Sequence, residues 1–459
     1  MIAEVKKAWG AYQAAKDGRS LAIVVGPENC DRNCSYCNVK KNWNPQTAST
    51  VDETCRQIDR IHQLGYRVLN DLGGETLATC PRIGTITSGK YIRCPYGMLC
   101  AAEDPKHPIR RATEEPFRTK EGFTFAEHAT EVIAYASKLG MVTNITTNGD
   151  FLTPENYSTL KNLGKAGLDF MIISDHTRTA RGFKNLVAKA RAVANEGIVP
   201  MVSRVFTAER ADSISLYART CIANGILFTT SIVQEIGGGF STVPVQSQIP
   251  TEEQIQQVFQ DLLDLKRTGF VRNNSNYLTK AQQYPGNSWK CNPEIDPFIH
   301  VRAVGEKGEV GVCPEARTGF DTTIDLDSND WRQIKREQVK KCQGCLYSCY
   351  FECEDPDFMS DLPTLLPIIL IKAGQAGIAR WLGRRAVEGM EILEVPQSKL
   401  ENWQARCKSY DSFTNRVVRK VDHIVGYAIG YAAIPFIFAA LFSYLAYDAI
   451  KEKVSSRRQ

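Results

Sequence analysis

Residues 124–149 read TFAEHATEVIAYASKLGMVTNITTNG, and this stretch combines a helix start, a helix stop and a strand. Thr124 and Glu127 have the spacing of a capping box, which predicts the first turn of a helix. Gly140 suits the left-handed residue that commonly ends a helix. The β-type run VTNITT follows at 142–147. The stretch therefore predicts a helix followed by a strand with polar residues at its end.

The same plan recurs six times between residues 20 and 270. The β-type runs are LAIVV (21–25), RVLND (67–71), VTNITT (142–147), FMIIS (170–174), VPMVSRV (199–205) and LFTTSIV (227–233). The helical patterns after them end at Gly65, Gly140, Gly167, Gly197, Gly225 and Gly269. Further helix starts are marked by Thr251 with Gln254, and by Thr153 before Pro154. Because parallel crossovers are right-handed and both sheet faces need cover, we expect an α/β fold with a partial (βα)6 TIM-like barrel.

Reactive groups of such barrels collect at the C-terminal ends of the strands. The residues that follow the six runs are polar, so they predict a site at one mouth of the barrel. In chain order they are Cys30, Cys34 and Cys37, then Gly73, Gly74 and Glu75, then Asn148, Ser174 with Asp175, Arg204, and Gln234 with Glu235.

Composition narrows the choice of function. The chain has 459 residues, 23% of them charged, and a formal net charge of +5, which is too mild and dispersed to predict nucleic-acid binding. It has 15 cysteines, but its first residues carry charges and no apolar core of a signal peptide. We therefore expect a reducing compartment, in which clustered cysteines are typical of metal or cluster ligands.

The cysteine triplet decides among these options. Residues 29–38 read NCDRNCSYCN, with the spacing Cys-x3-Cys-x2-Cys. Together with the six βα units, this stretch resembles the radical S-adenosylmethionine (SAM) enzymes over residues 20–270. The resemblance implies that Cys30, Cys34 and Cys37 hold a [4Fe-4S] cluster whose fourth iron binds SAM, and thiolates suit such clusters. It also implies reductive cleavage of SAM to a 5′-deoxyadenosyl radical, which abstracts hydrogen from the substrate.

The resemblance assigns further SAM contacts. Tyr36 corresponds to the aromatic residue beside the adenine, and Gly73, Gly74 and Glu75 match the motif that holds the methionyl ammonium group. Asn148 and Ser174 fall where ribose or methionyl contacts are expected, and Arg204 is a candidate partner for the methionyl carboxylate. Taken alone, the triplet has an alternative interpretation, in which its cysteines are three of the four ligands of a zinc site.

A second cysteine group follows residue 270. Gly308 before Cys313, and the Cys-x2-Cys pattern at Cys342, resemble the SPASM or twitch extension, which carries auxiliary iron-sulfur clusters. The spacing after that pattern is three residues instead of five, and six cysteines stand where a full set has seven. The sequence leaves open whether this region binds one or two auxiliary clusters. A structural zinc site is the alternative interpretation. The six residues are Cys291, Cys313, Cys342, Cys345, Cys349 and Cys353.

Two further segments set the domain plan. An insertion at 76–123 carries Cys80, Cys94 and Cys100. Four interpretations of it stay open: a lid, a substrate-binding element, a third metal site or a surface excursion.

Residues 424–447 contain no charge, and a helix of that length is about 36 Å long, enough to cross a bilayer. We expect an N-terminal helical segment (1–19), the core (20–270), a SPASM/twitch-like domain (271–360), a linker with an interfacial segment at 362–386 (361–423), a transmembrane helix (424–447) and a basic tail (448–459).

The expected protein is thus a membrane-anchored radical SAM enzyme with its catalytic domain in the cytosol. Its resemblance to SPASM proteins implies a peptide or protein substrate and a reducing partner such as flavodoxin or ferredoxin. The anchor favours instead a lipid or another membrane-resident substrate. A catalytically silent cluster or zinc scaffold is a third interpretation. Gly426 and Gly430 have the spacing of helix dimer contacts, which raises a homodimer as an option.

Overall fold

A nine-stranded sheet organises the chain, in the order β11-β10-β9-β1-β2-β5-β6-β7-β8. The structure is a computed structural model that describes residues 2–25, 49–71, 77, 91–93, 99–101, 121, 123–153, 156–233, 248–283, 290–302, 309–311, 323–325, 331–340, 348–396, 398 and 401. The six predicted strands are all present and pair in parallel. This α/β architecture fits the predicted partial TIM-like barrel. The strands are β1 (Leu21–Val25), β2 (Val68–Asp71), β5 (Val142–Thr147), β6 (Phe170–Ser174), β7 (Val199–Phe206) and β8 (Leu227–Ile232).

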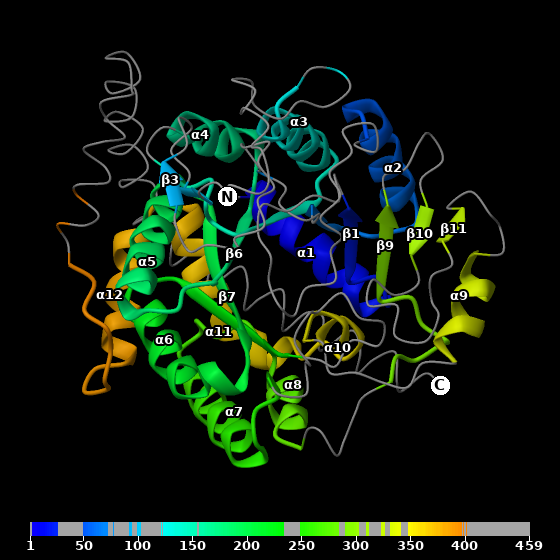
Figure 1. Ribbon diagram of the computed structural model, residues 1–459. Helices are drawn as coiled ribbons and strands as arrows, with labels where there is room; N and C mark the ends of the chain where they lie inside the picture. The colour runs from blue at the N-terminus through cyan, green and yellow to red at the C-terminus, as the bar shows by residue number, and fades with distance from the viewer. Residues whose placement is uncertain are drawn as a thin grey trace, which may run out of the picture.

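Helices follow the strands and cover one face of the sheet (Figure 1). The predicted capping boxes at Thr124 and Thr251 are both formed. All six predicted stop glycines have positive φ angles, between 71° and 97°, which only glycine adopts without strain. The helix predicted from Thr153 begins later, with Tyr157. The helices are α2 (Val51–Gln63), α3 (Phe125–Lys138), α4 (Tyr157–Ala166), α5 (Ala180–Asn195), α6 (Ala211–Ala223, after the 3-10 turn η3, Ala208–Arg210) and α7 (Glu252–Lys266).

The main core lies between the sheet and these helices. Alternate residues of the strands, such as Ile145, Ile173 and Val202, are fully buried and pack with helix residues such as Phe183 and Ile214. Burying each large apolar side chain contributes about 1.5–3 kcal/mol. The core therefore fixes which face of every strand points toward the helices.

The sheet continues into the region that the sequence assigns to a separate auxiliary domain. Strand β9 (Phe298–Arg302) pairs with β1 in parallel, and β10 (Glu309–Gly311) and β11 (Thr323–Asp325) follow antiparallel. Ile299 and Val301 share one apolar cluster with Ala22, Val24 and Leu69 of the first two strands. The auxiliary region thus extends the core sheet. Its helices are α8 (Ser275–Ala281), α9 (Trp331–Val339) and α10 (Ser348–Glu354).

Residues 358–386 form two packed helices, α11 (Phe358–Lys372) and α12 (Ala376–Ala386), where the sequence predicts a linker with an interfacial segment. The apolar side of α11 enters the core, since Leu370 and Ile371 are buried. Lys372 at its end binds Asp169 at 2.9 Å, and Lys7 of helix α1 (Ile2–Lys16) binds the same carboxylate at 2.6 Å. This cluster closes the N-terminal end of the barrel, because Asp169 directly precedes β6.

Two predicted segments are described little or not at all. Within the insertion 76–123, the strands β3 (Tyr91–Arg93) and β4 (Leu99–Ala101) form an antiparallel pair. No helix among the described residues is long and apolar enough to span a bilayer. The predicted transmembrane helix at 424–447 lies outside the described residues, as do Gly426 and Gly430.

Candidate functional site

We call the face of the sheet opposite the helices the inner face. It carries the strand residues that alternate with the buried apolar ones. Cross-strand neighbours on it include Asn70 with Asn144, and Ser203 with both Ser174 and Thr229. These side chains offer hydroxyl and amide groups without formal charge. The inner face therefore combines hydrogen-bonding groups with apolar side chains such as Ile23, Phe170 and Ile172.

Asn144 shows that this surface is not satisfied by its own residues. Its Oδ1 atom is buried and accepts no hydrogen bond within the described part of the chain. The hydroxyl of Thr146, two residues further along β5, donates to Oδ1 of Asn70 at 3.3 Å. A buried acceptor without a donor costs about 1–3 kcal/mol, so Asn144 suits a ligand that brings a donor.

Asn148 and Ser174 lie together at the C-terminal edge of the sheet, as the sequence predicts. Thr147 of β5 pairs with Ile173 of β6, so the residue after each of them lies at the same level. Asn148 is held by a turn in which its Oδ1 accepts a hydrogen bond from the Asp150 amide at 2.8 Å. This turn fixes the direction of the Asn148 side chain beside Ser174.

Arg204 does not join this group. Its guanidinium forms a buried ion pair with Asp175, and it lies 4.5 Å from the centre of the Tyr217 ring on α6. It also donates to the Ser213 hydroxyl, at 3.1 Å. The carboxylate that Arg204 binds is thus that of Asp175, on the helix side of the sheet. The predicted contact of Arg204 with the methionyl carboxylate stays a prediction.

The first two strands end beside each other, where the sequence places its main motifs. Val24 of β1 pairs with Asp71 of β2. The chain then leads from Val25 to Cys30, Cys34 and Cys37, and from Asp71 to Gly73, Gly74 and Glu75. Those residues and Tyr36 lie outside the described residues. Asp71 itself is buried, and burial raises its pKa to about 7.

Helix α10 brings the second cysteine group to the open side of the sheet. The amide of Ser348 donates to the Ser231 hydroxyl of β8 at 3.4 Å, and the carbonyl of Cys353 accepts from the Ser20 hydroxyl before β1 at 2.7 Å. Cys353 and Cys291 both pack against Ile23 and Phe298. The helix therefore connects β8 with the β1–β9 side and brings two predicted ligands to one place.

The other members of this cysteine group are less defined. Cys349 lies on α10, but Cys313, Cys342 and Cys345 lie outside the described residues. Within the part of the chain that the structure describes, no three His, Cys, Asp or Glu side chains form a metal site. Burial raises the pKa of the Cys353 thiol to about 12, which disfavours the thiolate until a cation is bound nearby.

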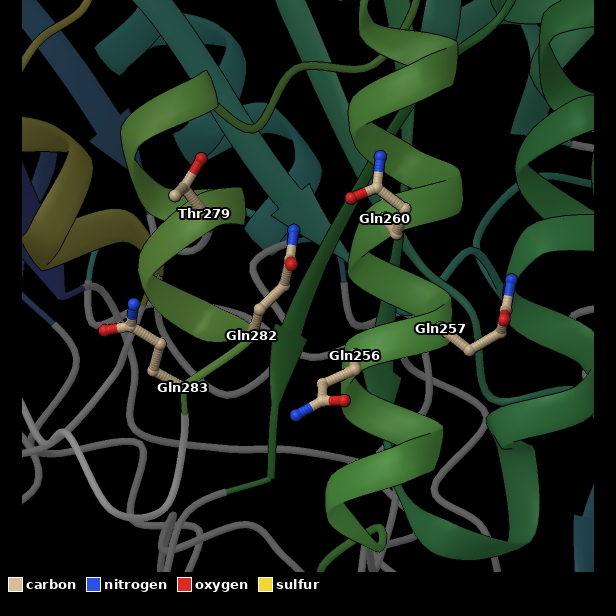
Figure 2. A pocket seen from close by; sticks show the side chains of 6 residues that line it. All are labelled: Gln256, Gln257, Gln260, Thr279, Gln282 and Gln283. Atoms are coloured by element: carbon tan, nitrogen blue, oxygen red, sulfur yellow. The ribbon is translucent and has the colours of Figure 1, made fainter.

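A separate groove of about 420 Å³ lies between α7 and α8 (Figure 2). Amide side chains dominate it, and two of them donate to aspartates of their own helix, Gln257 to Asp261 at 2.8 Å and Gln260 to Asp264 at 3.3 Å. Its described lining consists of amides and the Thr279 hydroxyl, and it includes no titratable side chain. Its lining residues are Gln256, Gln257, Gln260, Thr279, Gln282 and Gln283.

Sequence reasoning missed the inner-face residues inside the strands. Asn70, Asn144, Ser203 and Thr229 lie within the β-type runs, and the prediction considered mainly the residues after each run. A partial signal was present, because Asn144 and Thr146 flank the apolar Ile145 in VTNITT, and strand residues two apart lie on one face.

Comparisons with known proteins returned structures only. No protein-family model matches the chain, and no curated protein matches it. Streptococcus suis SuiB bound to the precursor peptide SuiA is 14% identical, with a TM-score of 0.44, and the match covers 72% of this chain and 69% of that one. SuiB bound to S-adenosylmethionine is 13% identical, with a TM-score of 0.45 and coverage of 72% and 69%. A further SuiB structure has 13% identity, a TM-score of 0.46 and coverage of 72% and 70%.

Proposed function

We propose that this protein is a radical SAM enzyme that modifies a peptide or protein substrate. The observation that carries the proposal is the position of the two motifs on the sheet. The cysteine triplet follows β1 and the Gly-Gly-Glu motif follows β2, and these strands are parallel neighbours. Both motifs therefore leave the sheet at the same edge. The resemblance predicts this arrangement for a cluster and for the SAM that it binds.

The described residues near that edge fit SAM. Asn148 and Ser174 offer an amide and a hydroxyl for ribose or methionyl groups, and the buried Oδ1 of Asn144 offers an acceptor. Cys30, Cys34 and Cys37 would hold the cluster, and Glu75 would bind the methionyl ammonium group. When bound, a reduced [4Fe-4S] cluster supplies the electron that cleaves SAM and so starts hydrogen abstraction from the substrate.

The chemistry of the inner face favours a peptide over a lipid chain as the substrate. Peptide groups donate and accept hydrogen bonds, so they match the half-buried hydroxyl of Ser203, which neighbours Ser174, and the buried Oδ1 of Asn144. An acyl chain would leave the buried Oδ1 of Asn144 without a donor, at a cost of about 1–3 kcal/mol. The resemblance of the second cysteine group to SPASM proteins supports the same substrate class.

The remaining parts of the proposal concern clusters and location. Cys291 and Cys353, which pack on one apolar cluster, would belong to an auxiliary iron-sulfur site together with Cys313, Cys342, Cys345 and Cys349. A flavodoxin or ferredoxin would supply electrons. The uncharged segment 424–447 would anchor the enzyme to the membrane, with the catalytic domain on the cytosolic side.

Electron paramagnetic resonance of the anaerobically reconstituted protein tests this proposal. We expect the dithionite-reduced wild type to give a [4Fe-4S]⁺ signal that SAM alters. The Cys30→Ala/Cys34→Ala/Cys37→Ala variant should lose the SAM-sensitive component and keep any auxiliary signal. Zinc in place of iron in metal analysis of both proteins would contradict the proposal and favour the scaffold interpretation.

A further inference from the structure

The position of α12 is fixed by contact between helix backbones. A Cβ atom added to Gly383 would lie 1.9 Å from the carbonyl oxygen of Ile222, near the end of α6. A Cβ atom added to Gly225 would lie 2.7 Å from the backbone nitrogen of Arg380. Ala379, one turn before Gly383, is fully buried. Because only small residues fit this contact, α12 cannot rotate about its axis without losing it.

This fixed position holds Trp381 on the outside of the molecule. Its side chain is 58% exposed, and Met390, just beyond the helix, is 41% exposed. Trp381 and Met390 therefore offer apolar area that a covering surface would remove from water. Figure 1 places α12 at the edge of the molecule, outside α5 and α6.

Three arginines gather where α12 meets α5. Arg191 of α5 is 5% exposed. Burial, and then the charges of Arg380 and Arg384 on α12, lower the pKa of Arg191 to about 10. Arg384 forms an ion pair with Glu394 at 3.2 Å, but both side chains are more than half exposed, so this pair adds little. Arg380 and Arg384 lie one turn apart on α12 and the Arg384 side chain is more than half exposed, so the helix can present positive charge to an anionic surface.

We propose that the outer face of α12 rests on an anionic lipid bilayer. Trp381 would lie at the interface between water and lipid, where tryptophan is enriched, and Arg380 and Arg384 would contact lipid phosphates. The length of chain beyond α12 argues for this partner, because it contains the uncharged segment 424–447. An anchored domain stays close to the bilayer, so a weak surface contact is enough to orient it. The proposal does not depend on SAM chemistry.

Fluorescence quenching by lipids brominated high on the acyl chain tests the contact in the full chain, bound to vesicles of phosphatidylcholine and phosphatidylglycerol. We expect Trp381→Phe to remove about half or more of the quenched fluorescence, as an interfacial tryptophan would. The matched control Trp9→Phe, on α1, should leave the quenched fraction unchanged. Arg380→Gln with Arg384→Gln should reduce the quenching to its level in vesicles of phosphatidylcholine alone.

Flotation with the vesicles is measured first, because it separates two failures. A chain that does not float contradicts the anchor and this proposal together. A chain that floats, and whose quenching is the same in Trp381→Phe and wild type, contradicts this proposal alone. A dimer in light scattering that Trp381→Ala dissociates would also overturn it, because the face would then bind a second copy of the chain.

Discussion

One step along a strand reverses the direction of a side chain, and this decides which polar groups enter the site. Ser174 and Ser203 are neighbours on the inner face. Asp175 and Arg204 follow them directly in the sequence and form an ion pair on the other side of the sheet. Ser174 and Ser203 therefore face the candidate site, whereas the polar residues that follow them, Asp175 and Arg204, stabilise the packing between sheet and helices.

Removing one member of the buried pair should destabilise the protein strongly. We expect Asp175→Ala to lower the free energy of unfolding by about 3–5 kcal/mol, because it leaves the Arg204 charge buried without a counter-ion. Adding Arg204→Met to this variant should recover part of the loss. Urea unfolding of the two variants measures both effects.

The exposed pair of Arg385 and Glu388, at 2.8 Å, provides a matched control. Glu388→Ala should change the free energy of unfolding by less than about 1 kcal/mol, because exposed pairs are well solvated. An equal effect of Asp175→Ala and Glu388→Ala would show that the buried pair has no special role.

For single residues, the sequence predicted where a side chain lies better than it predicted which group that side chain contacts. Asn148 and Ser174 were predicted from their places after strands, and the structure brings them together. For Arg204, the structure adds an ion pair with Asp175 that a local pattern does not show, and its predicted SAM contact stays a prediction. Asn144 was missed because a polar residue inside a strand is visible only once the inner face is known.

Elements whose ends carry local signals were predicted accurately. Capping boxes and left-handed glycines act within one helix turn, so they can be read without knowledge of the fold. Helices α11 and α12 lack this advantage. An apolar run beside arginines suits a membrane surface as well as a protein core, and only the tertiary contacts with Asp169 and Ile222 show which side of each helix faces the protein.

Two glycines of α12 allow a direct test of its docking. Gly383→Ala places a methyl group against the Ile222 carbonyl, so we expect it to lower the free energy of unfolding by about 1–3 kcal/mol or more. Gly377→Ala, in the same helix, meets nothing within 4 Å and should be neutral or stabilise by up to about 1 kcal/mol. Thermal unfolding of both variants compares them. Equal melting temperatures would show that α12 is not held by this contact.

The whole molecule is joined by contacts between distant parts of the chain. Strand β9 pairs with β1, α10 reaches both β8 and the start of β1, and Asp169 joins α1 to α11. Pairings of this kind depend on long-range packing and leave no local pattern. The sequence therefore predicted the six βα units but treated residues 271–360 as a separate domain and 361–423 as a linker.

The central claim is that this barrel cleaves SAM at the cluster held by Cys30, Cys34 and Cys37. The most direct measurement is the 5′-deoxyadenosine formed after SAM and dithionite are added to the anaerobically reconstituted protein. We expect product from the wild type and from Cys55→Ser, which changes a half-buried cysteine outside the motif, and none from the triple alanine variant. Equal amounts from the wild type and the triple variant, or none from a wild type that holds its cluster, would contradict the account.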